Sequence, residues 1–242
     1  MRFAPLLFVL LWSTGFIGAK LGLPHAEPLT FLLIRFSLVF VLMTVLALVM
    51  RAPWPRDARQ WFHIGVTGLL VHAVYIGGVF VSISKGLPAG VTSLVVGIQP
   101  LLTAVAAGWV LNEAVLARQW FGLSLGFIGV ALVVSGKLGT SYGLDALWPS
   151  LAALLAITVG TLYQKRFCPS FDWRTGSVAQ FLPTAIATGV AAGLTESFRV
   201  EWAPSFIFAL AWLVLGQSRG PVSLLNMLSR RGGPVNLASL FE

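Results

Sequence analysis

Residues 28–50 read PLTFLLIRFSLVFVLMTVLALVM and contain a single charged side chain, Arg35. About 20 apolar residues in an α-helix are enough to cross the roughly 30 Å of hydrocarbon in a bilayer. No water is available at that depth, so the backbone must satisfy its own hydrogen bonds, and a helix does this within one segment. The stretch therefore predicts a membrane-spanning helix.

Similar apolar runs recur along almost the whole chain. With Pro, Gly and charged residues as boundaries, they predict eight helices, at about 4–22, 28–50, 61–83, 89–111, 118–136, 146–166, 175–195 and 203–229. Hydrophobic residues make up 57% of the 242 residues and charged residues 10%, whereas a soluble domain has about 25% charged residues. The composition excludes a water-soluble fold and predicts an all-α polytopic membrane protein.

The basic residues indicate a bilayer, not a nucleic acid, as the partner. The net charge is +8, but the positive side chains are spread between apolar segments instead of gathering on one face. Lys and Arg are retained on the cytoplasmic side of a membrane. With the N-terminus inside, ten of the sixteen lie in cytoplasmic segments and four at external ends. We therefore expect a multi-pass protein of a bacterial-type inner membrane with a cytoplasmic N-terminus.

Matching features recur at an almost constant offset along the chain. Gly15 and Lys20 recur as Gly160 and Lys165, Arg35-Phe36 recurs as Gln180-Phe181, and residues 85–94 are echoed by 231–240. These matches predict two repeats, a first over 1–138 with five helices and an incomplete second over 144–242 with three helices and the start of a fourth. An odd number of helices inverts the second repeat, a common plan of secondary transporters.

Several of these motifs resemble a known family. They are Trp12-Ser13-Thr14-Gly15-Phe16 with Lys20, Arg35-Phe36, Gln99-Pro100, Asn112-Glu113 and the glycines 122, 126, 129 and 136. Together they resemble the drug/metabolite transporter superfamily, EamA type. The resemblance implies ten helices in two inverted five-helix repeats, and export or exchange of amino acids and related metabolites. Compared with the ten-helix plan of this family, we expect this chain to be a C-terminally truncated copy. Such a copy would be inactive alone or would associate as a homo-oligomer.

The acidic residues restrict the substrate. All eight lie in loops, at helix ends or at the terminus, so no carboxylate inside a span is available to neutralise an organic cation. The buried candidates are positive or polar instead. We therefore expect a small-molecule substrate that carries a carboxylate or is neutral.

Two ionisable residues inside predicted spans are the first candidates for a binding site. Arg35 either extends to the headgroups or faces the bundle and binds a substrate carboxylate, and we favour the second. His72 lies near the midplane, with Tyr75, Val79 and Ser82 on the same helical face. It is either a proton-linked group or a neutral packing histidine, and packing is the better interpretation.

The remaining candidates are polar or aromatic. The candidate substrate-binding residues are Trp12, Ser13, Arg35, His72, Tyr75, Gln99, Tyr163 and Gln180. The two glutamines belong to polar stripes that either line a cavity or join helices by hydrogen bonds. Trp12, Ser13 and Tyr163 would flank a central pocket, although an interfacial aromatic belt also explains Tyr163. We expect no cofactor and no metal site.

One motif suggests a different activity. Residues 139–143 fit the G-x-S-x-G pattern of hydrolase nucleophiles, which allows an intramembrane enzyme that uses Ser141 with His72. The motif lies in an external loop without a preceding strand, which argues against this. An inactive or interaction-only transporter remnant is the other alternative. The sequence predicts a secondary transporter working by alternating access, not an enzyme.

Overall fold

The computed structural model describes residues 14–110 and 143–216 and, between them, 120–122, 124, 125, 128, 129 and 132. The regular secondary structure of these described residues is helical. After a helix that ends at residue 22, the helices are α2 (Pro28–Val49), α3 (Ala58–Gly68), the π-helical segment η1 (Leu69–Val74), α4 (Tyr75–Ser84), α5 (Ala89–Val96), α6 (Gln99–Val110), α8 (Leu144–Phe167), α9 (Trp173–Thr195), α10 (Pro204–Ala211) and the π-helical segment η2 (Trp212–Gly216). The chain is an all-α polytopic membrane protein.

Within the described residues, five helices are long and apolar enough to cross a membrane. They are Pro28–Val49, Ala58–Ser84, Ala89–Ala106, Leu144–Phe167 and Trp173–Thr195, with a shorter apolar helix at Pro204–Leu215. Large apolar side chains such as Leu48, Val49 and Leu194 are exposed on their outer faces, as expected where lipid replaces water as the solvent. The predicted helices 4–22, 118–136 and 203–229 lie partly, and residues 234–242 wholly, outside the described residues.

Two predicted helices differ from the structure in their interior. The predicted helix 89–111 is divided into α5 and α6 by a turn at Gly97 and Ile98. Pro100 explains the division, because proline has no N–H for the carbonyl of Val96 and its ring would clash with that turn. The predicted helix 61–83 contains η1, a wider turn that sequence periodicity did not indicate and that is often found at functional sites.

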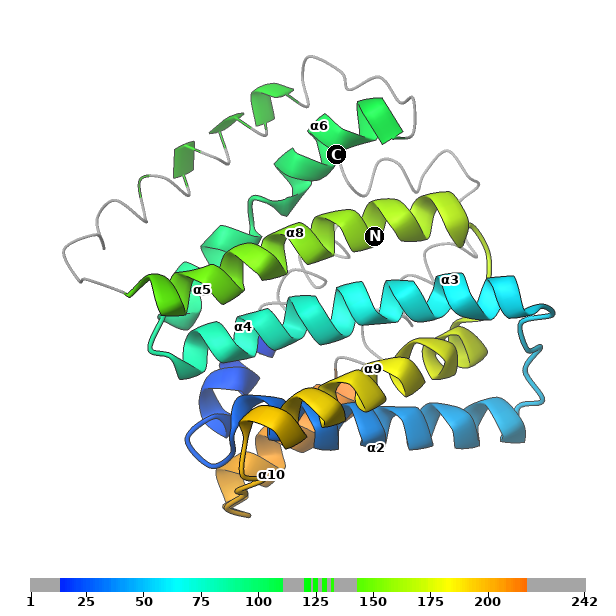
Figure 1. Cartoon of the computed structure of the whole chain (residues 1–242), viewed down its shortest axis with the longest axis horizontal. Coiled ribbons are helices and arrows are strands. Elements are labelled where there is room, and N and C mark those ends of the chain that lie inside the picture. Colours follow the sequence, from blue (N-terminus) through cyan, green and yellow to red (C-terminus); the bar gives the residue numbers. More distant parts are fainter. Residues whose placement is uncertain are drawn as a thin grey trace, which may run out of the picture.

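The helices pack in pairs that are distant in sequence. α2 lies along α9, and α4 lies along α8 (Figure 1). The main hydrophobic core lies where α2, α4, α9 and α10 meet and includes Phe31, Phe36, Phe80 and Phe206. The Phe31 ring contacts the rings of Phe80 at 5.4 Å and Phe206 at 5.0 Å between centroids. This aromatic contact joins three helices at one end of the bundle.

Carboxylates hold the start of α2 against the end of α9. Glu196 accepts hydrogen bonds from the backbone N–H of Leu29 at 2.8 Å and of Thr30 at 2.7 Å. These donors are among those that a helix N-terminus leaves without an intrahelical partner. In return, Glu27 accepts from the N–H groups of Ser197 at 2.9 Å and Arg199 at 3.1 Å. The two segments therefore cap each other at this end of the bundle.

Candidate functional site

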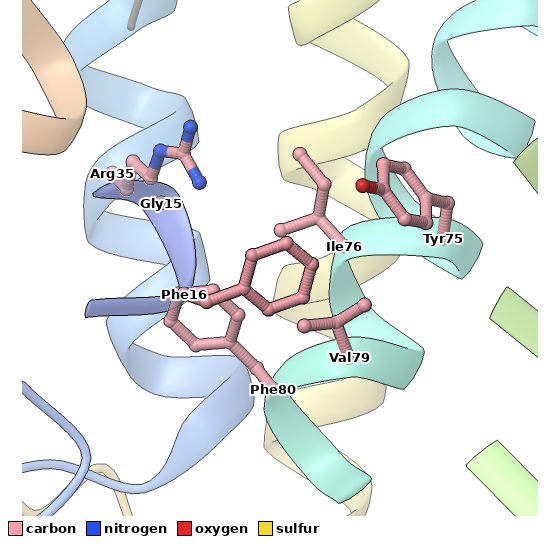
Figure 2. A pocket seen from close by; sticks show the side chains of 7 residues that line it. All are labelled: Gly15, Phe16, Arg35, Tyr75, Ile76, Val79 and Phe80. Carbon is pink, nitrogen blue, oxygen red and sulfur yellow. The ribbon is translucent and has the colours of Figure 1, made fainter. Parts of the chain in front are cut away.

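A small cavity lies between the helix that contains residues 14–22, α2 and α4. Its volume is about 60 Å³, and it is lined by Gly15, Phe16, Arg35, Tyr75, Ile76, Val79 and Phe80. Figure 2 shows the Arg35 guanidinium and the Tyr75 hydroxyl reaching toward the cavity from opposite sides, α2 and α4, with the ring of Phe16 between the two helices. Among the described residues, the cavity wall therefore combines a cation and a hydroxyl with otherwise apolar side chains.

Arg35 faces the interior of the bundle. Its side chain is buried, at 6% exposure, so it does not extend to the headgroups. The guanidinium carbon lies 5.8 Å from the ring centroid of Phe36, its neighbour on α2. A guanidinium keeps its charge in this setting and offers five N–H donors in a planar arrangement that matches a carboxylate. The side chain is thus placed to bind an anionic group in the cavity.

Tyr75 and Val79, which the sequence places on the same helical face as His72, lie on the wall of the cavity. Both are buried on α4, directly after η1. Ser82, the next residue on that helical face, is fully buried and donates its hydroxyl hydrogen to the carbonyl of Ala146. On this helical face, Tyr75 and Val79 therefore line the cavity, whereas Ser82 joins α4 to α8.

His72 and Gln180 contact each other and do not line the cavity. His72 Nε2 lies 3.3 Å from Gln180 Oε1, and its ring stacks on Phe181 with centroids 4.4 Å apart. The hydroxyl of Thr184 in turn donates to the backbone carbonyl of Gln180. Their positions fit the packing interpretation, in which polar side chains join helices inside the membrane. Among the described atoms, His72 Nδ1 is buried and has no hydrogen-bond partner.

Two further predicted residues also lie apart from the cavity wall. Tyr163 forms a hydrogen bond of 2.6 Å with Nδ1 of His63, whose ring stacks on Phe167. Gln99 donates to Thr103 on its own helix at 3.2 Å. Trp12 and Ser13 lie outside the described residues, and so does Ser141 of the alternative enzyme site. In the described part of the chain, the structure thus brings together Arg35 and Tyr75 at the cavity and His72 and Gln180 beside it.

Sequence reasoning did not identify several residues of the site. Phe16, Ile76 and Phe80 line the cavity, but an apolar residue in a membrane helix carries no signal that distinguishes a cavity wall from a lipid contact. His63 pairs with a residue 100 positions away, which helical periodicity cannot detect. The sequence places Val79 on the helical face of Tyr75, one turn further along, but does not distinguish it as a cavity residue.

The acidic side chains of the described chain lie away from the cavity. Glu27, Asp57 and Asp172 are N-cap residues, Glu196 is a C-cap, Asp145 is in a first turn and Glu201 precedes α10. The backbone N–H of Arg199, together with the backbone N–H and the hydroxyl of Ser197, holds the pKa of Glu27 below its usual range. The Arg174 side chain does the same to the pKa of Asp172. No group of three or more His, Cys, Asp or Glu residues that could hold a metal occurs among the residues described.

Known proteins with similar sequences are membrane transporters. A family model described as the EamA-like transporter family matches residues 3–135. The chain is 27% identical over 217 residues to the uncharacterized transporter YvbV of Bacillus subtilis, covering 85% of this chain and 70% of that protein. It is 28% identical over 165 residues to a probable amino-acid metabolite efflux pump of Salmonella typhimurium, covering 68% of this chain and 53% of that protein. It is 26% identical over 162 residues to a probable amino-acid metabolite efflux pump of Escherichia coli, covering 66% of this chain and 52% of that protein.

The fold is similar to that of a solved structure. A crystal structure superposes with a TM-score of 0.65 at 21% sequence identity, over 91% of this chain and 74% of that chain. The likeness supports the helical architecture. The chain spans about half the length of the two efflux pumps that it matches.

Proposed function

The chain belongs to the EamA-like transporter family, and from this premise we propose that it exports or exchanges an amino acid or a related small metabolite by alternating access. It is a multi-pass membrane protein and a small-molecule transporter, not an enzyme. Two relatives are named as probable amino-acid metabolite efflux pumps, and this supports the same substrate class here.

The observation that carries the proposal is the buried guanidinium of Arg35 at the wall of a cavity, with the Tyr75 hydroxyl on the facing helix. Placing a charged side chain inside a membrane span costs at least about 2.5–3.5 kcal/mol on insertion scales, so such groups are functional candidates. We propose that Arg35 binds the carboxylate of the substrate through paired hydrogen bonds. Tyr75 would donate a further hydrogen bond to the same group.

The other predicted site residues take supporting positions in this proposal. His72 and Gln180 would hold η1, which directly precedes the cavity residue Tyr75, against α9. Tyr163 with His63 would join α3 to α8 further along the bundle. Trp12 and Ser13 precede the cavity residues Gly15 and Phe16 in sequence, and we propose that they extend the site. Gln99 would contribute only if α6 turned toward the cavity during the transport cycle.

The proposal also includes the internal repeat and the orientation. We propose that residues 1–138 and 144–242 form inverted repeats that rock against each other. The N-terminus would be cytoplasmic, in agreement with the count of positive residues. Neither statement is needed for the assignment of Arg35.

Counterflow in proteoliposomes tests the proposed function. Liposomes of bacterial lipids that contain the purified full chain are preloaded with an unlabelled amino acid, and entry of the labelled compound is followed. A carrier that alternates between two faces exchanges inner for outer substrate, so we expect a transient accumulation that protein-free liposomes lack. If none of the amino acids or their 2-oxo acids gives trans-stimulated entry, the proposed function is wrong.

A further inference from the structure

In the described part of the chain, the cavity wall has two polar side chains on facing helices, and its other side chains are apolar. The guanidinium of Arg35 and the hydroxyl of Tyr75 provide the polar groups, and Gly15 has no side chain. The other lining residues are Phe16, Ile76, Val79 and Phe80, which present only carbon atoms (Figure 2). A ligand that fills this space must place an anionic or polar group near Arg35 and apolar atoms against the remaining wall.

No acidic side chain of the described part of the chain lines this cavity. At one end of the bundle, Glu27 and Glu196 accept hydrogen bonds from the opposing segments, which fixes both carboxylates there. Asp172 is held by the side chain of Arg174 at 2.7 Å. These carboxylates are therefore already bound elsewhere and do not serve an ammonium group in the cavity.

An ammonium group would be poorly solvated in this cavity. Moving it out of water is costly unless a carboxylate or several acceptors replace the lost hydration. Tyr75 offers one hydroxyl oxygen, and Arg35 carries charge of the same sign as the ammonium. The carboxylate and the apolar side chain of an amino acid thus gain favourable contacts, whereas its α-amino group does not.

We propose that the cavity binds monocarboxylates with a short apolar side chain and that an α-amino group does not contribute to this binding. The inference rests on the proposed function, because it takes the cavity at Arg35 as the substrate site. A second charged group on the ligand is disfavoured by the same apolar wall. The small volume of about 60 Å³ favours a short side chain over an extended one.

The test compares ligands that differ by one group each. Binding of 4-methylpentanoate, 2-oxo-4-methylpentanoate, leucine, serine and isopentylamine is measured by calorimetry on the purified full chain in nanodiscs. We expect the two desamino carboxylates to bind at least as tightly as leucine, and isopentylamine and serine not to bind in the same concentration range. Arg35→Gln should abolish binding of the carboxylates, while Arg59→Gln, an exposed arginine at the start of α3, should leave it unchanged.

The apolar wall is tested with a second pair of variants. Val79→Thr keeps the shape of the side chain but adds a hydroxyl to the wall, and it should weaken 4-methylpentanoate binding at least about threefold. Val159→Thr makes the same change on α8 at a side chain that is 52% exposed, and it should have no effect. Thermal unfolding of each variant confirms that the protein is folded.

The outcomes separate this inference from the proposed function. Leucine binding that is at least about tenfold tighter than 4-methylpentanoate binding would overturn the inference but leave the transporter assignment intact. Binding of serine without binding of 4-methylpentanoate would do the same. Absence of any carboxylate binding, or carboxylate binding that Arg35→Gln leaves unchanged, would overturn both the inference and the proposed role of Arg35.

Discussion

His72 and Gln180 are an example of polar side chains that connect helices inside the bundle. They come from η1 and α9, and their side-chain atoms lie 3.3 Å apart. The stacked ring of Phe181 fixes the plane of the imidazole, at 18° to its own. Because both side chains are partly buried inside the bundle and bond to each other there, the pair helps to specify how η1 and α9 are positioned relative to each other.

A double-mutant cycle measures the strength of this pair. His72→Phe and Gln180→Leu each leave one polar group without its partner, while the double variant removes both. Hydrogen bonds between membrane helices contribute about 0.6 kcal/mol on average and at most about 1.7 kcal/mol, and we expect a coupling energy in this range for unfolding in sodium dodecyl sulfate. A coupling energy indistinguishable from zero would show that the contact does not stabilise the fold.

At the scale of elements, the close approach of α3 and α9 depends on a glycine. A Cβ atom added to Gly68 would lie 2.5 Å from the carbonyl oxygen and 2.6 Å from the Cα atom of Gln180. Both are backbone atoms, so the clash cannot be relieved by a change of rotamer. Gly78 has a similar role between α4 and α8, where its Cβ would meet the backbone oxygen of Pro149.

We expect Gly68→Ala to lower the free energy of unfolding by about 1–3 kcal/mol, because overpacking forces the two helices apart. Gly193→Ala on α9 is the matched control. Its Cβ would meet only the ring of Phe198 at 3.8 Å, an ordinary contact, so the better helix propensity of alanine should make it neutral or stabilising. Equal stability of the two variants would contradict the close packing of α3 against α9.

The capping contacts between α2 and α9 predict a pH dependence. The N–H of Arg199, followed by the contacts of Ser197, lowers the pKa of Glu27 from its ordinary value of 4.5. The ionised carboxylate therefore stabilises the fold fully above that value, and this contribution is lost as the pH falls through the lowered pKa. The melting temperature of the native chain should fall more steeply than that of Glu27→Gln below about pH 5. If the melting temperatures of the two chains fell in parallel as the pH is lowered, this pH dependence would be refuted.

At the scale of the whole molecule, the ends of the helices group into two sides. The loop after α2 lies beside the start of α9, where Thr175 donates its hydroxyl hydrogen to the carbonyl of Pro53 at 2.7 Å. On the other side, Lys85 after α4 pairs with Asp145 at the start of α8 at 3.7 Å. The loop after α2 and the start of α9 thus lie on the side of the bundle opposite to Lys85 and Asp145.

Cysteine labelling determines the orientation. Asp57 is exposed at the start of α3, and Asp145 is exposed at the start of α8, so both sites accept a cysteine in a chain whose buried Cys168 is replaced by serine. With a cytoplasmic N-terminus, an impermeant thiol reagent added to intact cells should modify Asp145→Cys and not Asp57→Cys. The opposite labelling pattern would reverse the orientation.

How well each feature could be predicted depends on how far apart in the sequence the residues that determine it lie. Spans such as 28–50 could be predicted within a residue or two, because a run of about twenty predominantly apolar residues in a membrane forms a helix. The π-helical turn at His72 could not, because a local change in hydrogen bonding leaves hydropathy unchanged. Arg35 and Tyr75 were identified as polar groups in apolar helices, but their shared cavity depends on how α2 packs against α4, and no local pattern encodes that contact.

The central claim is that Arg35 binds the transported carboxylate, and counterflow by charge variants tests it most directly. The substrate is the carboxylate that gives the largest exchange with the native chain in proteoliposomes. We expect Arg35→Gln to lower the initial rate at least about tenfold, the equivalent of about 1.4 kcal/mol, and Arg59→Gln to stay close to the native rate. An initial rate for folded Arg35→Gln equal to that of the native chain would contradict the account.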